Sequence, residues 1–376
     1  MSAFRIAHAK AADWRAAALA CAEQVKGLDG ANLGFVYVTD RLGGDLAPTL
    51  DVLRGATGIA DWVGTVGVGV LATGQEYFDE PAIAVMTARL PEGAWRVFPS
   101  LTKGASTARG TARVSADAER WLDGARPSFG VVHADPRNPR TPKLIAELSE
   151  ESASFLVGGL TSSRGRYDQV AGEVVSGGLS GVLFRSDVAV ATGISQGCSP
   201  IGPTREVTQC QDNVLFTLDG GPALACLKRD MGDPADRDFP RAAENVHVAL
   251  PVVGSDTGDY LVRNLVGIDP ARGWVAIGDY VREGDRVVFC RRDASSARRD
   301  LDRMLKELKR RAGDGPKAGV YYSCVARGPN LFGAESQELA MIRDRLGDFP
   351  LVGFFCNGEI CHNRLYGYTG VIALFL

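Results

Sequence analysis

Two segments near the end of the chain place polar side chains directly after continuous apolar runs. They read SCVARGPNLFG (323–333) and GFFCNGEI (353–360), and glycine flanks the polar positions in both. An α/β sheet presents the groups that contact a ligand in this way, at the carboxyl ends of its strands. We therefore expect a small-ligand site whose members are Cys324, Arg327, Asn330, Cys356, Asn357 and Glu359.

The chemistry of these side chains indicates which ligand they suit. Arg327 offers a bidentate fork for a carboxylate or phosphate, and Glu359 can hold an ammonium group. The amides of Asn330 and Asn357 both donate and accept hydrogen bonds. An amino acid or a similar zwitterion fits this set. The alternative is that Arg327 and Glu359 pair with each other or cap loops, and hold no ligand.

A serine in a glycine-rich segment raises the question of nucleophilic catalysis. Residues 193–197 read GISQG and match G-x-S-x-G, in which a strained strand-to-helix turn exposes a serine. Pro200 and Pro203 follow and oppose the required helix, so we favour a glycine-rich loop that contains Ser195. A hydrolase that uses Ser195 or Cys324 remains an alternative. Its base must be one of the four histidines, His8, His133, His247 and His362.

Potential metal and cofactor ligands lie close to one another near the end of the chain. Cys356, Cys361 and His362 carry ligand atoms for zinc, or an axial ligand for haem. Their spacing is neither C-x2-C nor C-x-x-C-H, so we expect isolated thiols and no metal site. Residues 67–72 also match G-x-G-x-x-A, but no helix pattern follows, and we expect no dinucleotide cofactor.

The elements that position these residues recur three times along the chain. Each unit reads as an apolar strand, an amphipathic helix, a glycine-containing strand and a further apolar strand. The strands fall at 34–40, 61–71 and 81–90, then at 128–135, 154–160 and 180–187, and finally at 318–324, 350–360 and 368–376. Thr141 with Pro142 predicts a helix start, and Gly347 predicts a helix stop. The pattern predicts a mixed α/β fold, in which repeated strand-helix-strand-strand units form mixed sheets with helices on their faces.

A β-rich stretch, with one short helix near 222–231, separates the second and third units. The segment GDPADRDFPR (232–241) is polar, contains two prolines and lacks apolar periodicity. We therefore predict a linker there, between domains that span 1–231 and 242–376. Residues 294–311 predict a helix with one apolar face. Its other faces mix basic with acidic side chains, which is typical of a solvated helix and not of a nucleic-acid contact.

The composition excludes several classes of protein. Hydrophobic residues make up 45% of the 376 residues and charged residues 23%, as in soluble globular proteins. The net charge is −3 and both signs are interspersed, so neither nucleic acid nor an anionic membrane is implied as a partner. The weakly charged run 62–74 is shorter than the ~20 residues that cross a bilayer. Charged residues interrupt the alanine-rich stretch 11–22 and exclude a signal peptide, so we expect a cytoplasmic protein whose eight cysteines stay reduced.

Four passages of the sequence resemble one known protein family. They are GISQGCSPIGPTREV (193–207), YLVRNLVGIDP (260–270), SCVARGPNLFG (323–333) and GFFCNGEI (353–360), followed by a closing GYTGVIALF. In order and separation they resemble the FIST N and C domains, named for F-box and intracellular signal transduction proteins. The N-terminal third is similar to the family in its pattern of strands and helices more than in its motifs.

The resemblance implies an intracellular sensor that binds a small ligand and is not an enzyme. FIST modules are joined in bacteria to kinase, cyclase-like or chemotaxis output modules, and in eukaryotes to an F-box. Because the FIST-like region takes up this sequence, the resemblance implies a stand-alone sensor that signals through a separate partner. Ser195, Gln196 and Cys198 lie in the first matching passage, and the resemblance adds them to the candidate ligand-binding residues.

A haem-bound sensor of nitric oxide is an alternative that the same resemblance raises, since some FIST-like proteins are described in that way. His362 would be the axial ligand, with aromatic side chains of Phe354, Phe355, Tyr366 and Tyr368 around it. The segment CHNRLY is a short polar connection, and a histidine there tends to face solvent. This connection is also shorter than in the family, which alters one wall of any pocket.

Overall fold

The computed structural model describes residues 3–102, 127–232, 239–252 and 258–376. The chain forms two compact units: unit 1 comprises Met1–Ser195 with Leu301–Leu376, and unit 2 comprises Gln196–Asp300. This division differs from the predicted one. The predicted linker 232–241, most of which lies outside the described residues, falls within unit 2. Unit 2 lies before the third predicted unit, but it interrupts the observed third repeat, whose first strand, Val190–Ser195, folds with residues 301–376 although the two parts are far apart in sequence.

Unit 1 is built from three repeats, each of which contains the predicted strand-helix-strand-strand unit together with a further strand at its start and a short hairpin. Repeat 1 contains β1 (Phe4–Lys10), α1 (Trp14–Val25), β2 (Leu33–Thr39), α2 (Leu46–Thr57), β3 (Trp62–Gly67), β4 (Gly69–Ala72), β5 (Gln75–Phe78) and β6 (Ala82–Ala88). Repeat 2 contains β7 (Trp95–Leu101), β8 (Pro127–Ala134), α4 (Thr141–Ser152), β9 (Phe155–Leu160), β10 (Gln169–Ala171), β11 (Glu173–Val175) and β12 (Leu179–Arg185). Repeat 3 contains β13 (Val190–Ser195), α8 (Ala294–Ala312), β22 (Ala318–Cys324), α9 (Gln337–Leu346), β23 (Leu351–Cys356), β24 (Glu359–Cys361), β25 (Arg364–Tyr366) and β26 (Gly370–Phe375). The start of α8, residues 294–300, falls within unit 2.

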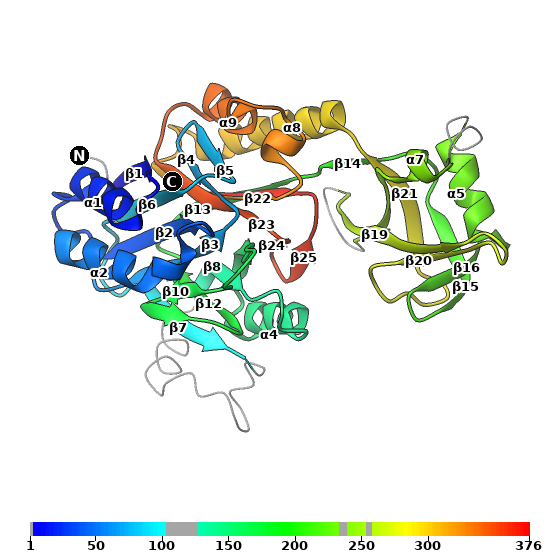
Figure 1. Cartoon of the computed structure of the whole chain (residues 1–376), viewed down its shortest axis with the longest axis horizontal. Helices are drawn as coiled ribbons and strands as arrows, with labels where there is room; N and C mark the ends of the chain where they lie inside the picture. The colour runs from blue at the N-terminus through cyan, green and yellow to red at the C-terminus, as the bar shows by residue number, and fades with distance from the viewer. Residues whose placement is uncertain (1–2, 103–126, 233–238, 253–257) are drawn as a thin grey trace. The chain divides into compact units, whose positions relative to one another are not determined.

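The described strands of unit 1 form three six-stranded sheets with one common order (Figure 1). The first sheet is β1-β6-β2-β3-β10-β11, the second is β7-β12-β8-β9-β24-β25, and the third is β13-β26-β22-β23-β4-β5. Two parallel strands form the centre of each sheet, namely β2 with β3, β8 with β9, and β22 with β23. The prediction of a mixed α/β fold made of repeated units is confirmed.

The repeats exchange hairpins in a cycle. After its second parallel strand, each repeat continues into a short hairpin that joins the sheet of another repeat. β4 of repeat 1 pairs with β23, β10 of repeat 2 pairs with β3, and β24 of repeat 3 pairs with β9. Every sheet therefore contains strands from two repeats, and no repeat forms a complete sheet without a hairpin from another repeat.

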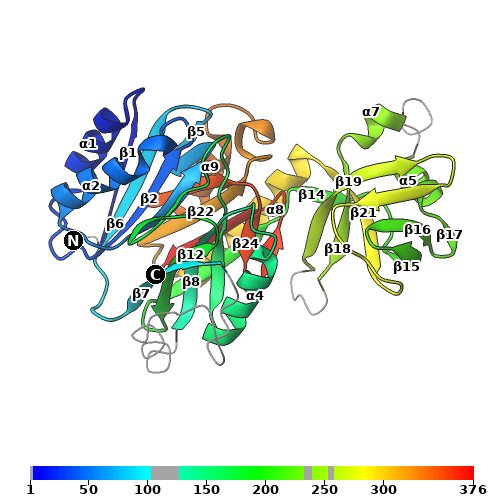
Figure 2. The ribbon, with the colours of Figure 1, turned by 60° about the horizontal axis from the view of Figure 1, so that its bottom comes forward.

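Amphipathic helices cover the outer faces of the sheets, as Figure 2 shows for α1 and α2 over the first sheet. Leu46, Leu50 and Leu53 of α2 are buried in the same cluster as Val36 and Val38 of β2. The predicted helix ends are confirmed: α4 begins at Thr141, with Pro142 in its first turn, and α9 ends at Leu346, with Gly347 as its cap. No helix among the described residues has the length and apolar character needed to span a bilayer.

The inner faces of the three sheets meet in a core that contains three hydrogen-bonded side chains. Tyr37, His133 and Tyr322 occupy equivalent positions on β2, β8 and β22. Each directly follows the residue that pairs in register with a glycine of the neighbouring parallel strand, namely Gly64, Gly158 or Gly353. All three are fully buried. The Tyr37 hydroxyl lies 3.1 Å from His133 Nε2 and 2.9 Å from the Tyr322 hydroxyl. One residue from each repeat thus joins the repeats where the sheets converge.

Three equivalent glycines allow the parallel strands to approach closely. A Cβ atom built on Gly64 would lie 1.7 Å from the carbonyl oxygen of Val36, and Gly158 and Gly353 show the same overlap with Val132 and Tyr321. No side chain fits at these positions unless the backbone moves. The glycine that the sequence pattern placed in each second strand therefore has a steric cause.

Unit 2 is a separate mixed α/β structure with its own core. Its described elements are β14 (Cys198–Pro200), β15 (Arg205–Gln211), β16 (Val214–Leu218), β17 (Gly221–Pro222), α5 (Ala223–Met231), α7 (Phe239–Ala243), β18 (Val246–Pro251), β19 (Tyr260–Asp269), β20 (Trp274–Ile277) and β21 (Arg286–Arg292). Leu224 and Leu227 of α5 pack against Leu215 and Val275 of the sheet. The predicted β-rich stretch and its short helix are confirmed.

We predict that alanine at Gly353 destabilises unit 1 by about 3 kcal/mol, because the added Cβ overlaps a backbone carbonyl and forces strands apart. Gly55 is the control, since it lies exposed within α2 and a Cβ there meets nothing within 4 Å. Gly55→Ala is expected to stabilise the protein by about 0.5–1 kcal/mol. Urea unfolding of both variants measures the difference, and equal effects would contradict the steric argument.

We also predict an acid-dependent loss of stability that His133 causes. Burial lowers the pKa of His133 from 6.5 to about 3. The folded state therefore resists protonation, and its stability is complete above pH 6.5 and falls as the pH drops toward 3. The slope from this group approaches about 1.4 kcal/mol per pH unit. His133→Phe should reduce this slope between pH 6.5 and 4 in urea unfolding, whereas His362→Gln, at an exposed site, should retain it.

Candidate functional site

Arg327 lies in the loop after β22 and is fully buried. Its guanidinium group pairs with the Glu338 carboxylate of α9, with Nε 2.8 Å and Nη2 2.7 Å from Oε1. The guanidinium also lies over the ring of Phe332, with Cζ 4.9 Å from the ring centroid, and its Nη2 is 3.4 Å from Ser195 Oγ. The predicted Arg327 fork is therefore occupied by a carboxylate of the protein itself, and that carboxylate belongs to Glu338 and not to Glu359.

Glu338 is the centre of a network on the outer face of the third sheet, which we call the outer cluster. Its carboxylate accepts hydrogen bonds from the Tyr321 hydroxyl at 2.6 Å, the Ser323 hydroxyl at 3.0 Å and the Gly328 amide at 3.0 Å. A Cβ on Gly370 would lie 2.2 Å from the Tyr321 hydroxyl oxygen, so glycine there makes room for the network. This network fixes the loop that carries Arg327.

A second carboxyl group, from Glu76 of repeat 1, reaches the same face through the exchanged hairpin β4–β5. Glu76 accepts a hydrogen bond from the Leu339 amide at 3.1 Å, in the first turn of α9. A carboxylate at a helix amino terminus is favoured by the helix dipole. Burial and the nearby Glu338 carboxylate raise the pKa of Glu76 to about 7. The sequence patterns did not indicate Glu76 or Glu338, because neither follows an apolar strand of its own repeat.

Glu359, the first residue of β24, forms an inner cluster with Cys324, Cys356 and Thr369. Cys324 and Cys356 are register partners at the ends of β22 and β23. Glu359 is fully buried, and its Oε2 accepts from the Thr369 amide at 3.0 Å and the Thr369 hydroxyl at 2.8 Å. Burial raises the pKa of Glu359 to about 8 against the opposing effect of Thr369. Among the described residues no donor lies in hydrogen-bond geometry to Glu359 Oε1.

The predicted site residues thus fall into groups. Ser195, Cys324, Arg327, Cys356 and Glu359 come together in unit 1. Asn330 and Asn357 belong to the same loops but are exposed, and the Asn330 amide donates to the Val325 carbonyl at 2.9 Å. Gln196 and Cys198 belong to unit 2, where the backbone amide of Gln196 donates a hydrogen bond to the Asp300 carboxylate at 2.7 Å. Whether these residues bind a ligand stays a prediction.

His362 occupies the turn between β24 and β25, with a positive φ of 56°. It is exposed and stacks on Phe155, with ring centroids 5.2 Å apart. Its place in a short connection is as the sequence indicated. His8 contacts Tyr77 and His133 contacts Tyr37, and among the described contacts of these three histidines none is with Ser195 or Cys324. The fourth, His247, lies in unit 2.

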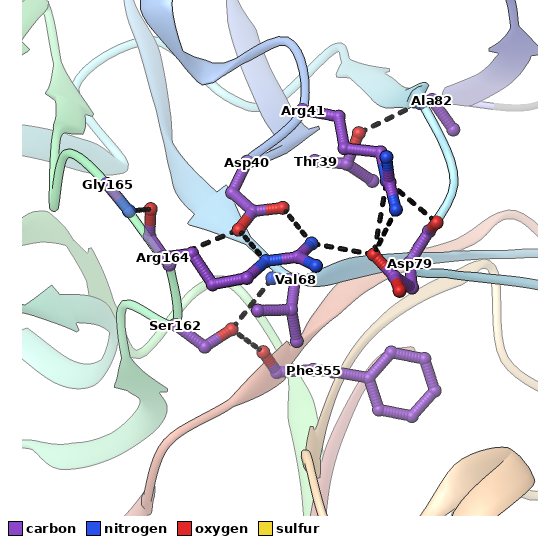
Figure 3. Close-up of polar contacts among 11 residues, drawn as sticks. Thr39, Asp40, Arg41, Val68, Asp79, Ala82, Ser162, Arg164, Gly165 and Phe355 are labelled. Atoms are coloured by element: carbon purple, nitrogen blue, oxygen red, sulfur yellow. Dashed lines mark hydrogen bonds and ion pairs between the residues drawn. The ribbon is translucent and has the colours of Figure 1, made fainter.

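The strand ends of the first two sheets also carry acidic side chains, but these have arginine partners. Asp40 follows β2 and pairs with Arg164, which also contacts Asp79 at 2.7 Å. Arg41 pairs with the same Asp79 carboxylate (Figure 3). Asp135 follows β8 and pairs with Arg137 at 2.7 Å.

Ser162, near the Asp40–Arg164 pair in Figure 3, links strand ends of all three repeats. Its hydroxyl accepts a hydrogen bond from the Val68 amide and donates one to the Phe355 carbonyl.

Comparison with known proteins matches most of the chain to two domain families. Residues 32–221 match the FIST N domain, and residues 223–362 match the FIST C domain. The chain belongs to the FIST family. The FIST N and C regions meet at 221–223, about ten residues before the predicted linker, and both regions contribute to unit 1 and unit 2. The Arg327 loop, the inner cluster residues Cys324, Cys356 and Glu359, and α9 lie within the FIST C match.

Relatives of this FIST protein occur in mycobacteria. Uncharacterized protein MT0656 of Mycobacterium tuberculosis is 30% identical over 327 residues, which cover 84% of this chain and 83% of that protein. Uncharacterized protein Mb0898c of Mycobacterium bovis is 29% identical over 212 residues, which cover 54% of this chain and 55% of that protein. FIST domains are associated with signal transduction and the sensing of small ligands.

We predict that Arg327 acts first as a structural partner of Glu338. Arg327→Met leaves the Glu338 carboxylate buried without its cation, and we expect a loss of about 3–5 kcal/mol in the free energy of unfolding. The double variant Arg327→Met with Glu338→Leu removes both charges and should recover about half of that loss. Urea unfolding of the two single variants and the double variant measures the coupling. Additive losses would show that the pair is not the main interaction of Arg327.

Proposed function

We propose that this FIST protein is an intracellular small-ligand sensor that acts in the cytoplasm and signals through a separate protein partner. The observation that carries the proposal is the inner cluster, where a buried carboxyl group with one unpartnered oxygen lies at the ends of central strands within the FIST C region. A polar group in such a place costs free energy in the unliganded protein unless a ligand or proton satisfies it. An amino acid or another small amine-bearing molecule is the ligand class that we propose.

The proposed role is binding and not catalysis. Burial raises the pKa of the Cys324 thiol well above its usual range, which disfavours the thiolate that a nucleophile requires. Ser195 is fully buried, and its described polar neighbour is Arg327, which cannot act as a base. These features favour a site that holds a ligand without reacting with it.

A thermal-shift screen with amino acids, simple amines, nucleotides and haem tests the proposal. A ligand at about 100 times its Kd stabilises the native state by about 2.7 kcal/mol, which corresponds to about 5–10 °C in Tm. We expect at least one amine-bearing compound to reach this range. If no compound in the panel raises the Tm at millimolar concentration, the sensor proposal fails.

Two matched thiol variants assign the shift to the inner cluster. Cys356→Ala alters that cluster, whereas Cys21→Ala removes a thiol that is equally buried, on α1 in repeat 1. Both variants should lose intrinsic stability, but only Cys356→Ala should reduce the ligand-induced shift. An equal ligand response in both variants would place the binding site elsewhere.

A further inference from the structure

The buried carboxyl groups of unit 1 differ in how their charge is satisfied. The buried acidic residues among those described in this unit are Glu76, Asp135, Asp168, Glu338 and Glu359. Three of them have an arginine partner: Asp135 pairs with Arg137, Asp168 with Arg166, and Glu338 with Arg327. Glu76 has none, but its carboxylate caps the amino terminus of α9. Glu359 alone in this set has neither an ion-pair partner nor a helix terminus.

The two oxygens of Glu359 are not equivalent. Oε2 accepts both hydrogen bonds from Thr369, whereas Oε1 is buried and accepts none. The neighbouring thiols, Cys324 and Cys356, are held in their neutral form because burial raises the pKa of each. In its ionised form Glu359 offers one unpartnered oxygen beside two neutral thiols, with the positive charge of Arg327 also acting on the carboxyl group. A group that satisfies this oxygen must supply positive charge and a hydrogen-bond donor.

We propose that Glu359 Oε1 anchors the primary ammonium group of a small ligand. This inference rests on the proposed sensor function and narrows its ligand to one whose amine, and not its carboxylate, is recognised. A guanidinium group prefers two free carboxylate oxygens, and only one is free here. A metal ion requires several ligands, and the described residues contain no suitable group of three histidine, cysteine or acidic side chains. Arg327 is held by Glu338 and gives no anchor for a ligand carboxylate.

Binding at this position exchanges a proton for the ligand's charge. The carboxyl group of Glu359, with its pKa raised to about 8, is mostly protonated at neutral pH. An ammonium ion that pairs with the carboxylate therefore releases one proton to solvent. The apparent Kd must therefore rise about tenfold for each pH unit below the pKa of Glu359, and become constant well above it.

The structure also indicates how a buried anchor can report on its ligand. Glu359 begins β24, the strand that repeat 3 contributes to the second sheet, and it pairs there with Gly159. The pairing extends over three residues. Because Glu359 is fully buried, a ligand reaches it only when neighbouring segments separate. The three-residue pairing of β24 with β9 is the contact between repeats 2 and 3 that lies next to Glu359.

The test is a titration of the full-length protein with ethylammonium chloride, followed by thermal shift at pH 6, 7, 8 and 9. Sodium chloride controls for ionic strength, and sodium acetate tests for recognition of a carboxylate. We expect ethylammonium to bind about tenfold more tightly at pH 7 than at pH 6, with a further gain of only about twofold between pH 8 and pH 9. Binding of ethylammonium that does not change with pH, or preferential binding of acetate, would overturn the proposal without a variant being needed.

Two variants locate the effect. Glu359→Gln keeps the shape of the side chain and is expected to weaken ethylammonium binding at pH 8 at least tenfold. Glu147→Gln is the matched control, because Glu147 of α4 also has a buried oxygen without a partner but pairs with Lys143 through its other oxygen. Binding that persists in Glu359→Gln overturns this inference. If an anionic or neutral compound binds while ethylammonium does not, the inference fails and the sensor proposal stands, and if nothing binds, both fail.

Discussion

The hydrogen bonds among Tyr37, His133 and Tyr322 impose a constraint on the whole of unit 1. Each residue comes from a different repeat, each is fully buried, and their polar atoms must meet within hydrogen-bond distance. A buried hydroxyl or imidazole that loses its partner costs roughly 1–3 kcal/mol, so the three sheets are fixed in register with one another. Because the strands are parallel at the centre of each sheet, this register also brings their carboxyl ends together. The inner cluster lies at the ends of β22 and β23, two residues beyond Tyr322 on β22.

The cyclic exchange of hairpins adds a second link between the repeats. It places Glu76 of repeat 1 on the outer face of the third sheet and Glu359 of repeat 3 next to the second sheet. A single repeat could form neither arrangement. The two faces of β22 then acquire different chemistry, since adjacent residues of a strand point in opposite directions. Tyr321 and Ser323 support the Arg327–Glu338 pair, while Tyr322 and Cys324 face the inner core.

The sequence predicted those features that depend on short-range pattern. The apolar runs located three strand regions in each repeat, and Thr141 and Gly347 located helix ends, because capping and strand alternation are local effects. The first strands β1 and β7 were not predicted, and the predicted strands 61–71 and 350–360 are each two strands in different sheets. The residues after β22 and β23 were predicted to lie together, and Cys324, Arg327, Cys356 and Glu359 do lie together. Whether Arg327 is available to a ligand depends on which carboxylate of the protein it pairs with. That carboxylate belongs to Glu338 on α9, and the polar residues of this helix have the sequence pattern of a solvent-exposed helix face.

Long-range contacts left no such signal. Glu76 and Leu339 are 263 residues apart, and nothing in the β4–β5 segment indicates which sheet it joins. The division of the chain into units was missed for the same reason, since the insertion interrupts a repeat at Ser195 without any change of composition there. A polar, proline-containing segment indicates a loop, but it does not distinguish a loop within a unit from a boundary between units.

The insertion of unit 2 has a topological consequence. Its first residue, Gln196, donates its backbone amide to the side chain of Asp300, its last residue, at 2.7 Å, so the chain enters and leaves the unit at one point. A module with adjacent ends can be gained, lost or exchanged between homologous proteins without stretching the host. The host repeat would need only a short turn between β13 and α8 to close the gap. The inserted module can therefore change without requiring a change in the threefold core of its host.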